Sequence, residues 1–191
     1  MSDHPEDIID VALRVAAALE SVGGRYFVGG SLASSLDGHP RATNDVDFVV
    51  DLSLGKLAAF TAALGPDFEV DGDMLRDAIL RGRCANIFYL PQILKVDLFG
   101  HAHGAYDDSE FSRRRAVPVR EGRQLVVKAP EDTILRKMLW YREGGEVSDR
   151  QWSDILGVLR AQGNGLDFSY LRTWATQLAV RDLLDRAVTE A

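Results

Sequence analysis

The sequence predicts a mixed α/β protein: a mixed sheet flanked by helices, followed by a smaller helical part. Three observations lead to this prediction. Residues 25–128 alternate short apolar stretches of strand length with segments of helical periodicity. Residues 130–191 show helical periodicity alone. The 191 residues are 46% hydrophobic and 27% charged, as in ordinary folded domains. We therefore expect an α/β core over residues 1–129 and a helical subdomain over residues 130–191.

Periodicity and turn residues give the individual elements. Apolar residues at helical spacing predict a first helix over residues 6–21, which Gly23-Gly24 ends. Strands are predicted at residues 25–29, 45–51, 68–70, 84–90, 92–99, 116–120 and 123–128. Further helices are predicted at residues 30–38, 53–64, 73–81, 130–143, 148–161, 167–178 and 180–190. Residues 101–115 are polar, and we expect them to be irregular.

Composition and charge exclude several classes of protein. The formal net charge of −7 argues against a broad basic face that coats nucleic acid, but not against a local basic groove. No apolar run approaches the roughly 20 residues of a membrane-spanning helix. The single cysteine, Cys84, excludes an internal disulfide, and its apolar surroundings predict a buried side chain. The acidic residues 1–7 are unlike a secretory signal, so a cytoplasmic location is expected.

The chemistry-bearing motif begins at a glycine-rich turn. Gly29-Gly30-Ser31 follows a predicted strand, opens a predicted helix and precedes Asp45-Val46-Asp47 by thirteen residues. Glycines let a phosphate approach the backbone, and a helix N-terminus directs N–H groups at an anion. Residues two apart on a strand share a face, so Asp45 and Asp47 present their carboxylates together. Such a pair repels unless a cation lies between the two groups, and it suits Mg²⁺.

A third acid lies on a later predicted strand. Asp97 is surrounded by apolar residues there, and a buried carboxylate is costly unless it binds a metal or pairs with a cation such as Lys95. As a metal ligand, Asp97 would complete a site for phosphoryl transfer and could take the proton from an attacking hydroxyl.

The motif resembles the nucleotidyltransferase superfamily, which has the DNA polymerase β-like fold. The strings Val28–Ser31 and Arg41–Phe48 are similar to its small AbiEii-like branch, which includes the minimal nucleotidyltransferase toxins of toxin–antitoxin pairs. Residues 130–132, 137, 149–150 and 154–156 resemble the same branch. The likeness spans about residues 25–160.

The resemblance implies roles for the matching residues. Asp45, Asp47 and Asp97 would hold Mg²⁺ (or Mn²⁺), and Asp97 would act as ligand or base. Lys137 would be a catalytic residue that neutralises triphosphate charge, reaching out as an exposed side chain from the flank of its helix. Asp154 would orient Lys137 or the nucleotide. The expected nucleotide-binding residues are Gly29, Gly30, Ser31, Arg41, Thr43 and Asp154.

The implied activity is transfer of a nucleoside monophosphate from an NTP to an acceptor. The branch favours RNA, such as a tRNA 3′ end, and an antitoxin protein as partner. An alternative acceptor is a small molecule such as an aminoglycoside, which the negative net charge favours, or a protein. A second alternative is an inactive nucleotide-binding module, against which the three acids argue. A basic groove around Arg81, Arg83 and Arg113–Arg115 would suit RNA.

Two further groups of residues are interpreted as structural. His101 and His103 lie in a glycine-containing loop and are expected to be polar surface. Trp140, Trp152 and Trp174 recur on predicted helices and are expected in the core.

Overall fold

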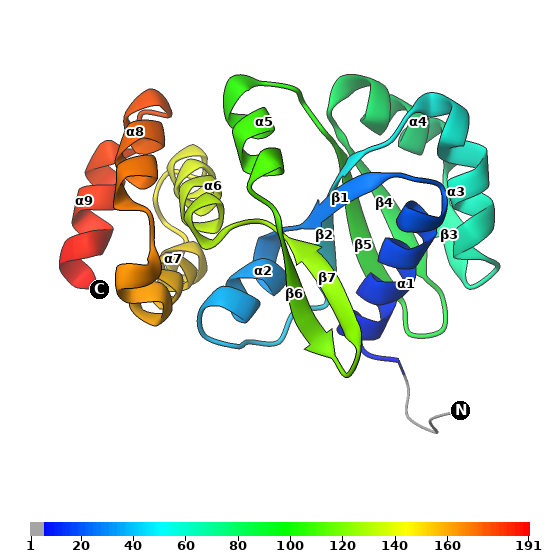
Figure 1. Ribbon diagram of the computed structural model, residues 1–191, viewed down its shortest axis with the longest axis horizontal. Helices are drawn as coiled ribbons and strands as arrows, with labels where there is room; N and C mark the ends of the chain where they lie inside the picture. The colour runs from blue at the N-terminus through cyan, green and yellow to red at the C-terminus, as the bar shows by residue number, and fades with distance from the viewer. Residues whose placement is uncertain (1–5) are drawn as a thin grey trace. The chain divides into compact units, whose positions relative to one another are not determined.

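The computed structural model describes residues 6–191. Most of the acidic segment of residues 1–7, on which the expected cytoplasmic location rests, lies outside the described residues. The described chain forms two compact units (Figure 1). The sheet unit contains the chain up to Gly29 and Thr43–Val127, and the helical unit contains Gly30–Ala42 and Lys128–Ala191. The change from sheet unit to helical unit between Val127 and Lys128 lies near residue 129, where the boundary was expected. The grouping of residues 30–42 with the C-terminal helices has no counterpart in the sequence expectations.

The sheet unit is built on one seven-stranded mixed sheet with the order β3-β4-β5-β2-β1-β7-β6 (Figure 1). The central strand β2 pairs in parallel with β5 and antiparallel with β1, and β1 pairs in parallel with β7. This confirms the expected mixed α/β architecture. The strands are β1 Arg25–Val28, β2 Asp45–Asp51, β3 Phe68–Val70, β4 Cys84–Tyr89, β5 Leu94–Gly100, β6 Arg115–Arg120 and β7 Arg123–Val127.

Buried and partly exposed residues alternate along β2, so one face of the strand is covered and the other carries the acids. Val46, Phe48 and Val50 are fully or almost fully buried, whereas the odd-numbered residues of the strand are partly exposed. Helix α1 packs on β1, β2 and β7, and α4 packs on β4 and β5. The helices of this unit are α1 Ile8–Ser21, α3 Leu57–Leu64 after the 3₁₀ turn η1 Leu54–Lys56, α4 Gly72–Arg81 and α5 Ala105–Ser112.

Gly100 shows how closely β5 and α4 approach. A side-chain carbon at this glycine would collide with the backbone carbonyl oxygen of Ala78 on α4. Glycine is therefore required here by the space between strand and helix.

The sequence expectations for residues 101–115 and for Cys84 are wrong. Residues 105–112 form α5, although residues 101–115 were expected to be irregular. The helix lacks an apolar stripe, but the Asp107 carboxylate accepts a hydrogen bond from the Gly104 N–H at its start and so stabilises the first turn. Cys84 is exposed and not buried, because it begins β4 with its side chain on the less covered face.

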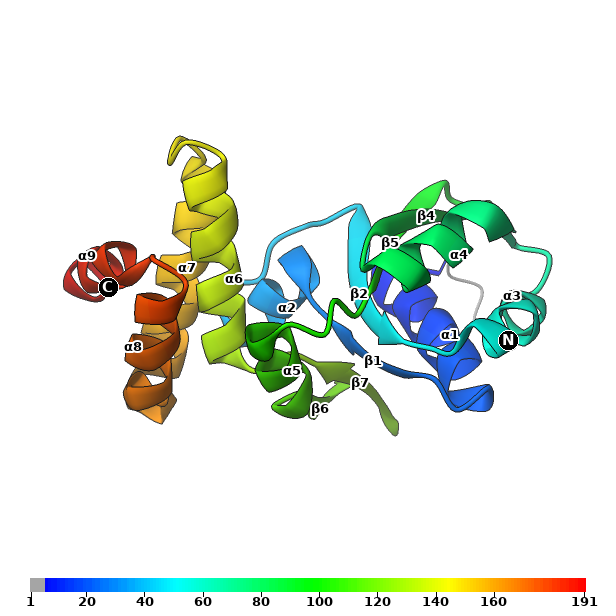
Figure 2. The same ribbon diagram turned by 90° about the horizontal axis from the view of Figure 1, so that it is seen from above.

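The helical unit packs α2 against two of the C-terminal helices. Helix α2 contacts α6 and α7, α6 also contacts α7 and α8, and α9 contacts α7 and α8 (Figure 2). Its core contains Ile134, Leu135, Met138 and Ile155. The elements are α2 Gly30–Asp37, α6 Pro130–Glu143, α7 Asp149–Gln162, the 3₁₀ turn η2 Gly163–Gly165, α8 Phe168–Gln177 and α9 Arg181–Glu190.

The tryptophans of the helical unit only partly match expectation. Trp152 is buried and its indole N–H donates to Glu190, whereas Trp140 and Trp174 remain partly exposed. Within residues 6–191, no helix combines the length and apolar character needed to cross a membrane.

Candidate active site

The paired acids lie on the central strand of the sheet unit. Asp45 and Asp47 belong to β2 and share the partly exposed face, as their spacing predicts. The Thr43 hydroxyl donates a 2.7 Å hydrogen bond to Oδ1 of Asp45. Thr43 therefore fixes the orientation of the first carboxylate at the point where the chain enters the strand.

Asp97 lies beside this pair. The parallel register of β2 and β5 places Asp47 directly opposite Asp97. Neighbouring strands are about 4.8 Å apart, and residues in register on adjacent strands share a face. Asp97 is only 8% exposed, and Asn86, its register partner on β4, donates a 2.5 Å hydrogen bond to Oδ1. The sheet thus gathers three carboxylates from two strands on one face.

Lys95 places a positive charge among these carboxylates. Its Nζ lies 2.7 Å from Oδ2 of Asp97, and its register partner on β2 is Asp45. The hydrogen bond to Asp97 raises the pKa of Lys95, and the charges of Asp97, Asp45 and Asp47 add to this effect. Lys95 and Asp97 are two residues apart on one strand, so their side chains share a face, and this spacing is visible in the sequence.

The carboxylates and their surroundings fit a divalent metal ion. Carboxylate oxygens are the ligands that Mg²⁺ prefers, and one or two carboxylates plus substrate oxygens are its usual protein-bound set. The Lys95 ammonium shows that this group of acids attracts a cation. Asp45, Asp47 and Asp97 are therefore suitable ligands by position and chemistry.

The glycine-rich turn connects to the same strand through the backbone. The Gly29 N–H donates a 2.8 Å hydrogen bond to the Asp47 carbonyl. Gly30 has a φ of 55°, a left-handed conformation that glycine adopts without strain, and it begins α2. The backbone there can turn sharply from β1 into a helix without a side chain over the turn.

A basic cluster is built separately within the helical unit. The Arg41 guanidinium donates two 2.9 Å hydrogen bonds to Asp154, one to each carboxylate oxygen. Arg41 also donates to the Ser31 hydroxyl at 2.5 Å. This bidentate pairing holds Arg41 in one orientation beside the first turn of α2.

Lys137 completes the basic cluster, and its expected exposure is wrong. The side chain is 3% exposed because α6 directs it into the helical unit, where Nζ lies 2.8 Å from Oδ2 of Asp154. Gln151 accepts a second hydrogen bond from Lys137, at 3.2 Å. Burial lowers the pKa of Lys137 despite its ion pair with Asp154.

Asp154 stays ionised at the centre of this cluster. Burial alone would raise the pKa of Asp154, but hydrogen bonds from Arg41 and Lys137 outweigh burial and bring the pKa below its ordinary value. One carboxylate thus orients two cations, and the charge of Lys128 also acts on Lys137. The cluster carries an excess of positive charge, which is suited to a phosphate.

The structure groups the expected site residues in two sets. The sheet unit brings together Asp45, Asp47, Asp97 and Thr43, with Gly29 bonded to the same strand. The helical unit brings together Ser31, Arg41, Lys137 and Asp154. Asn86 and Gln151 are not among the site residues expected from the sequence. Asn86 lies opposite Asp97 because β4 pairs with β5 in this register, and the sequence alone does not reveal that pairing.

Comparison with known proteins supports the fold. No protein-family model and no curated protein sequence matches the chain. The solved structure of the antibiotic-resistance factor ANT(2'')-Ia matches with a TM-score of 0.57 and 14% identity, over 95% of this chain and 99% of that chain. An antigenic nucleotidyltransferase-like protein from Paracoccidioides brasiliensis matches with a TM-score of 0.55 and 19% identity, over 97% of this chain and 95% of that chain. These likenesses confirm the expected nucleotidyltransferase-type fold. The AbiEii-like branch stays a prediction.

Proposed function

We propose that the protein transfers a nucleoside monophosphate from a nucleoside triphosphate to an acceptor and releases pyrophosphate. The observation that carries this proposal is the register of β2 and β5, which sets Asp47 beside Asp97, with Asp45 two residues away on the same face. A structural role alone does not account for three carboxylates gathered on one face around a single lysine. The shared fold supports the same activity.

In this proposal the three carboxylates would hold Mg²⁺ or Mn²⁺. A bound divalent ion would supply charge neutralisation of the triphosphate and polarisation of the attacking oxygen. Thr43 fixes Asp45, and Asn86 fixes Asp97 through one of its oxygens. The other oxygen of Asp97 contacts Lys95, and it would accept the proton of the attacking hydroxyl once Lys95 is displaced.

The basic cluster of the helical unit, taken by itself, is suited to bind phosphate groups. Arg41 and Lys137 supply positive charge, and Asp154 holds both cations in fixed orientations. Ser31 and the backbone of Gly29 and Gly30 would add hydrogen-bond donors at the start of α2. Orientation of the cations before substrate binds reduces the cost of ordering them during transfer.

A small cationic molecule, such as an aminoglycoside, is the acceptor that the observations favour. The net charge of −7 attracts cationic molecules. The antibiotic-resistance factor shares the fold over nearly its whole length. Arg81 and Arg83, expected to form part of a basic groove, both pair with Asp77, and Arg114 donates to the carbonyl of Phe111. The Asp77 carboxylate offsets part of the charge of Arg81 and Arg83 that an RNA backbone would meet, and the bond to Phe111 fixes the position of Arg114 without changing its charge.

The second candidate acceptor is an RNA 3′ end, as the AbiEii-like resemblance implies. The motif over residues 28–48 supports it, and the activity would then belong to a cytoplasmic toxin with an antitoxin partner. Growth arrest on expression, relieved by a neighbouring gene product, would favour this acceptor over a small molecule.

The test supplies each of the four NTPs, labelled at the α-phosphate, with Mg²⁺ and either an aminoglycoside panel or total tRNA. We expect label transfer to one acceptor class and stoichiometric pyrophosphate release. Asp47→Asn should reduce transfer by about a thousandfold or more, because the amide keeps the shape and loses the charge that binds the metal. Asp51→Asn is the matched control: it lies on the same strand and face but pairs with Arg25.

Three results would contradict the proposal. They are absence of transfer to every acceptor, transfer that persists in the presence of a chelator, and equal rates for Asp47→Asn and Asp51→Asn. Nucleotide binding without transfer would instead favour the inactive binding module.

A further inference from the structure

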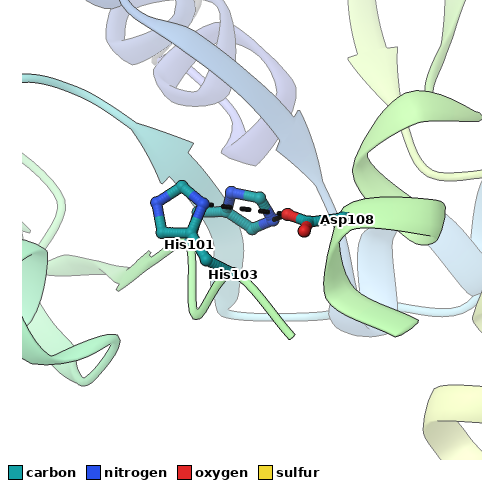
Figure 3. A group of neighbouring side chains, drawn as sticks. All are labelled: His101, His103 and Asp108. Atoms are coloured by element: carbon teal, nitrogen blue, oxygen red, sulfur yellow. Dashed lines mark ion pairs between the residues drawn. The ribbon is translucent and has the colours of Figure 1, made fainter. Parts of the chain in front are cut away.

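A second cluster of metal-ligating side chains lies in the sheet unit, apart from the three carboxylates. His101 and His103 follow the end of β5, and Asp108 belongs to the first turn of α5 (Figure 3). One potential ligand atom from each residue lies within 4.8 Å of the other two. Nε2 of His101 is 3.3 Å and Nδ1 of His103 is 3.7 Å from Oδ1 of Asp108.

His101 is buried, contrary to the expected polar surface. It is 8% exposed, and its ring stacks on Phe111 of α5 with the ring centroids 4.6 Å apart. Its backbone N–H continues the sheet by donating to the Val50 carbonyl at 2.9 Å. Within the described part of the chain Nδ1 has no hydrogen-bond partner, and Nε2 has only the 3.3 Å contact with Oδ1 of Asp108. A buried polar atom without a partner is costly, so this ring is suited to a ligand.

Two of the three donor separations are close to the spacing of ligands on a tetrahedral ion. Ligands about 2.0–2.1 Å from zinc lie about 3.3 Å apart at tetrahedral angles. The two separations from Oδ1 of Asp108 are close to this value. Figure 3 shows Asp108 extending from α5 toward the two rings, which approach with their centroids 4.2 Å apart.

We propose that His101, His103 and Asp108 bind a divalent transition-metal ion of the Zn²⁺ type, with water in the fourth position. Two imidazoles and one carboxylate favour Zn²⁺ and neighbouring metals over Mg²⁺, which prefers oxygen ligands alone. The ion would satisfy a buried nitrogen of His101 and tie the end of β5 to α5. Asp97 is four residues earlier on β5, about 13 Å along the strand, so this site differs from the carboxylate site.

The experiment uses the full chain without a histidine tag, stripped of metal by a chelator. Calorimetric titration with Zn²⁺ should give one tight site per chain, and Co²⁺ should give the visible absorption of a tetrahedral nitrogen–oxygen site. His103→Ala and Asp108→Asn should each weaken Zn²⁺ binding at least tenfold. Both side chains are more than half exposed, so their loss should leave the fold intact.

Two controls separate this site from other zinc ligands. His39→Ala removes a histidine outside the cluster and should leave Zn²⁺ affinity unchanged. Asp47→Asn removes a carboxylate of the other site and should also leave it unchanged. Zn²⁺ should raise the melting temperature of the wild type and not that of His103→Ala. Absence of a tight site in the wild type, wild-type affinity in His103→Ala, or loss of binding in Asp47→Asn would each overturn the proposal.

Discussion

Lys95 and a divalent cation compete for the same carboxylates. Lys95→Met removes the positive charge near Asp45, Asp47 and Asp97, so their mutual repulsion should destabilise the protein in a chelator. Mg²⁺ should reduce the difference by replacing that charge. The measurement is the urea midpoint of both proteins with chelator and with Mg²⁺. Lys56→Met, an exposed lysine bonded to the Gly23 carbonyl, is the control and should change neither midpoint much.

The wild type and Lys95→Met also test the raised pKa of Lys95. The pKa of folded Lys95 lies above the ordinary value of 10.5, so its ion pair stabilises the fold fully below about pH 10.5. This contribution is lost as pH rises through the folded-state pKa. The difference in midpoint between wild type and Lys95→Met should therefore be constant near neutral pH and shrink above pH 10.5. A difference that grows with pH would contradict the assignment.

Lys137 contributes to stability as well as to the proposed phosphate site. Exposed lysines contribute little to folding, but this one is 3% exposed and pairs with Asp154. Breaking a buried ion pair costs about 3–5 kcal/mol, and Lys137→Ala should fall near the lower limit because Arg41 still bonds Asp154. Lys137→Met keeps the alkyl chain and should cost less. Chemical denaturation measures both.

Arg142→Ala serves as the reference for an ion pair at the surface. Arg142 pairs with Asp182 on the exterior of the helical unit, so its removal should leave the unfolding midpoint almost unchanged. Equal midpoints for Lys137→Ala and Arg142→Ala would mean that the Lys137 contacts add nothing to folding. Nucleotide titration of the same variants separates the binding role of Lys137 from its structural one.

At the level of elements, the contact between β5 and α4 depends on one glycine. Gly100→Ala places a methyl group against the Ala78 carbonyl oxygen, and the strand carrying Asp97 must shift or α4 must move away. Overpacking of this kind costs about 1–3 kcal/mol. Gly72→Ala at the start of the same helix meets no atom within 4 Å and should be neutral or slightly stabilising. Thermal unfolding of the two variants compares them, and a neutral Gly100→Ala would contradict the close packing.

For the whole molecule, the helical unit is discontinuous in sequence. Helix α2 contributes the buried Leu32 and Ala33, and Arg41 supplies two hydrogen bonds to Asp154. A fragment of residues 128–191 lacks these groups, so it should unfold without a cooperative transition. Adding a peptide of residues 30–42 should increase its helicity and cooperativity by circular dichroism. Cooperative unfolding of the fragment alone would show that α2 is dispensable.

Local sequence signals predicted most strands and helices, but not the contacts that depend on packing. The alternation around Asp45 and Asp47 predicts a shared face, and the structure has it. The polar sequence of α5 contains no apolar stripe, so its helix was missed, and with it the position of Asp108 beside the histidines. Lys137 was misplaced because α6 is covered by α2 and α7, a contact between distant segments that periodicity does not contain.

The exposed thiol of Cys84 offers a chemical reporter of ion occupancy, because the chain has one cysteine. Although the side chain is accessible, neighbouring atoms partly desolvate the thiol and raise the pKa of Cys84 to about 11, and the charges of Asp97 and Asp47 add to the rise. A divalent ion on those carboxylates should lower this pKa and increase the thiolate fraction. Alkylation by iodoacetamide should therefore accelerate as Mg²⁺ is added, with a half-maximal concentration that reports its affinity. In Asp47→Asn the rate should start higher and respond less, whereas identical rate curves would place the ion elsewhere.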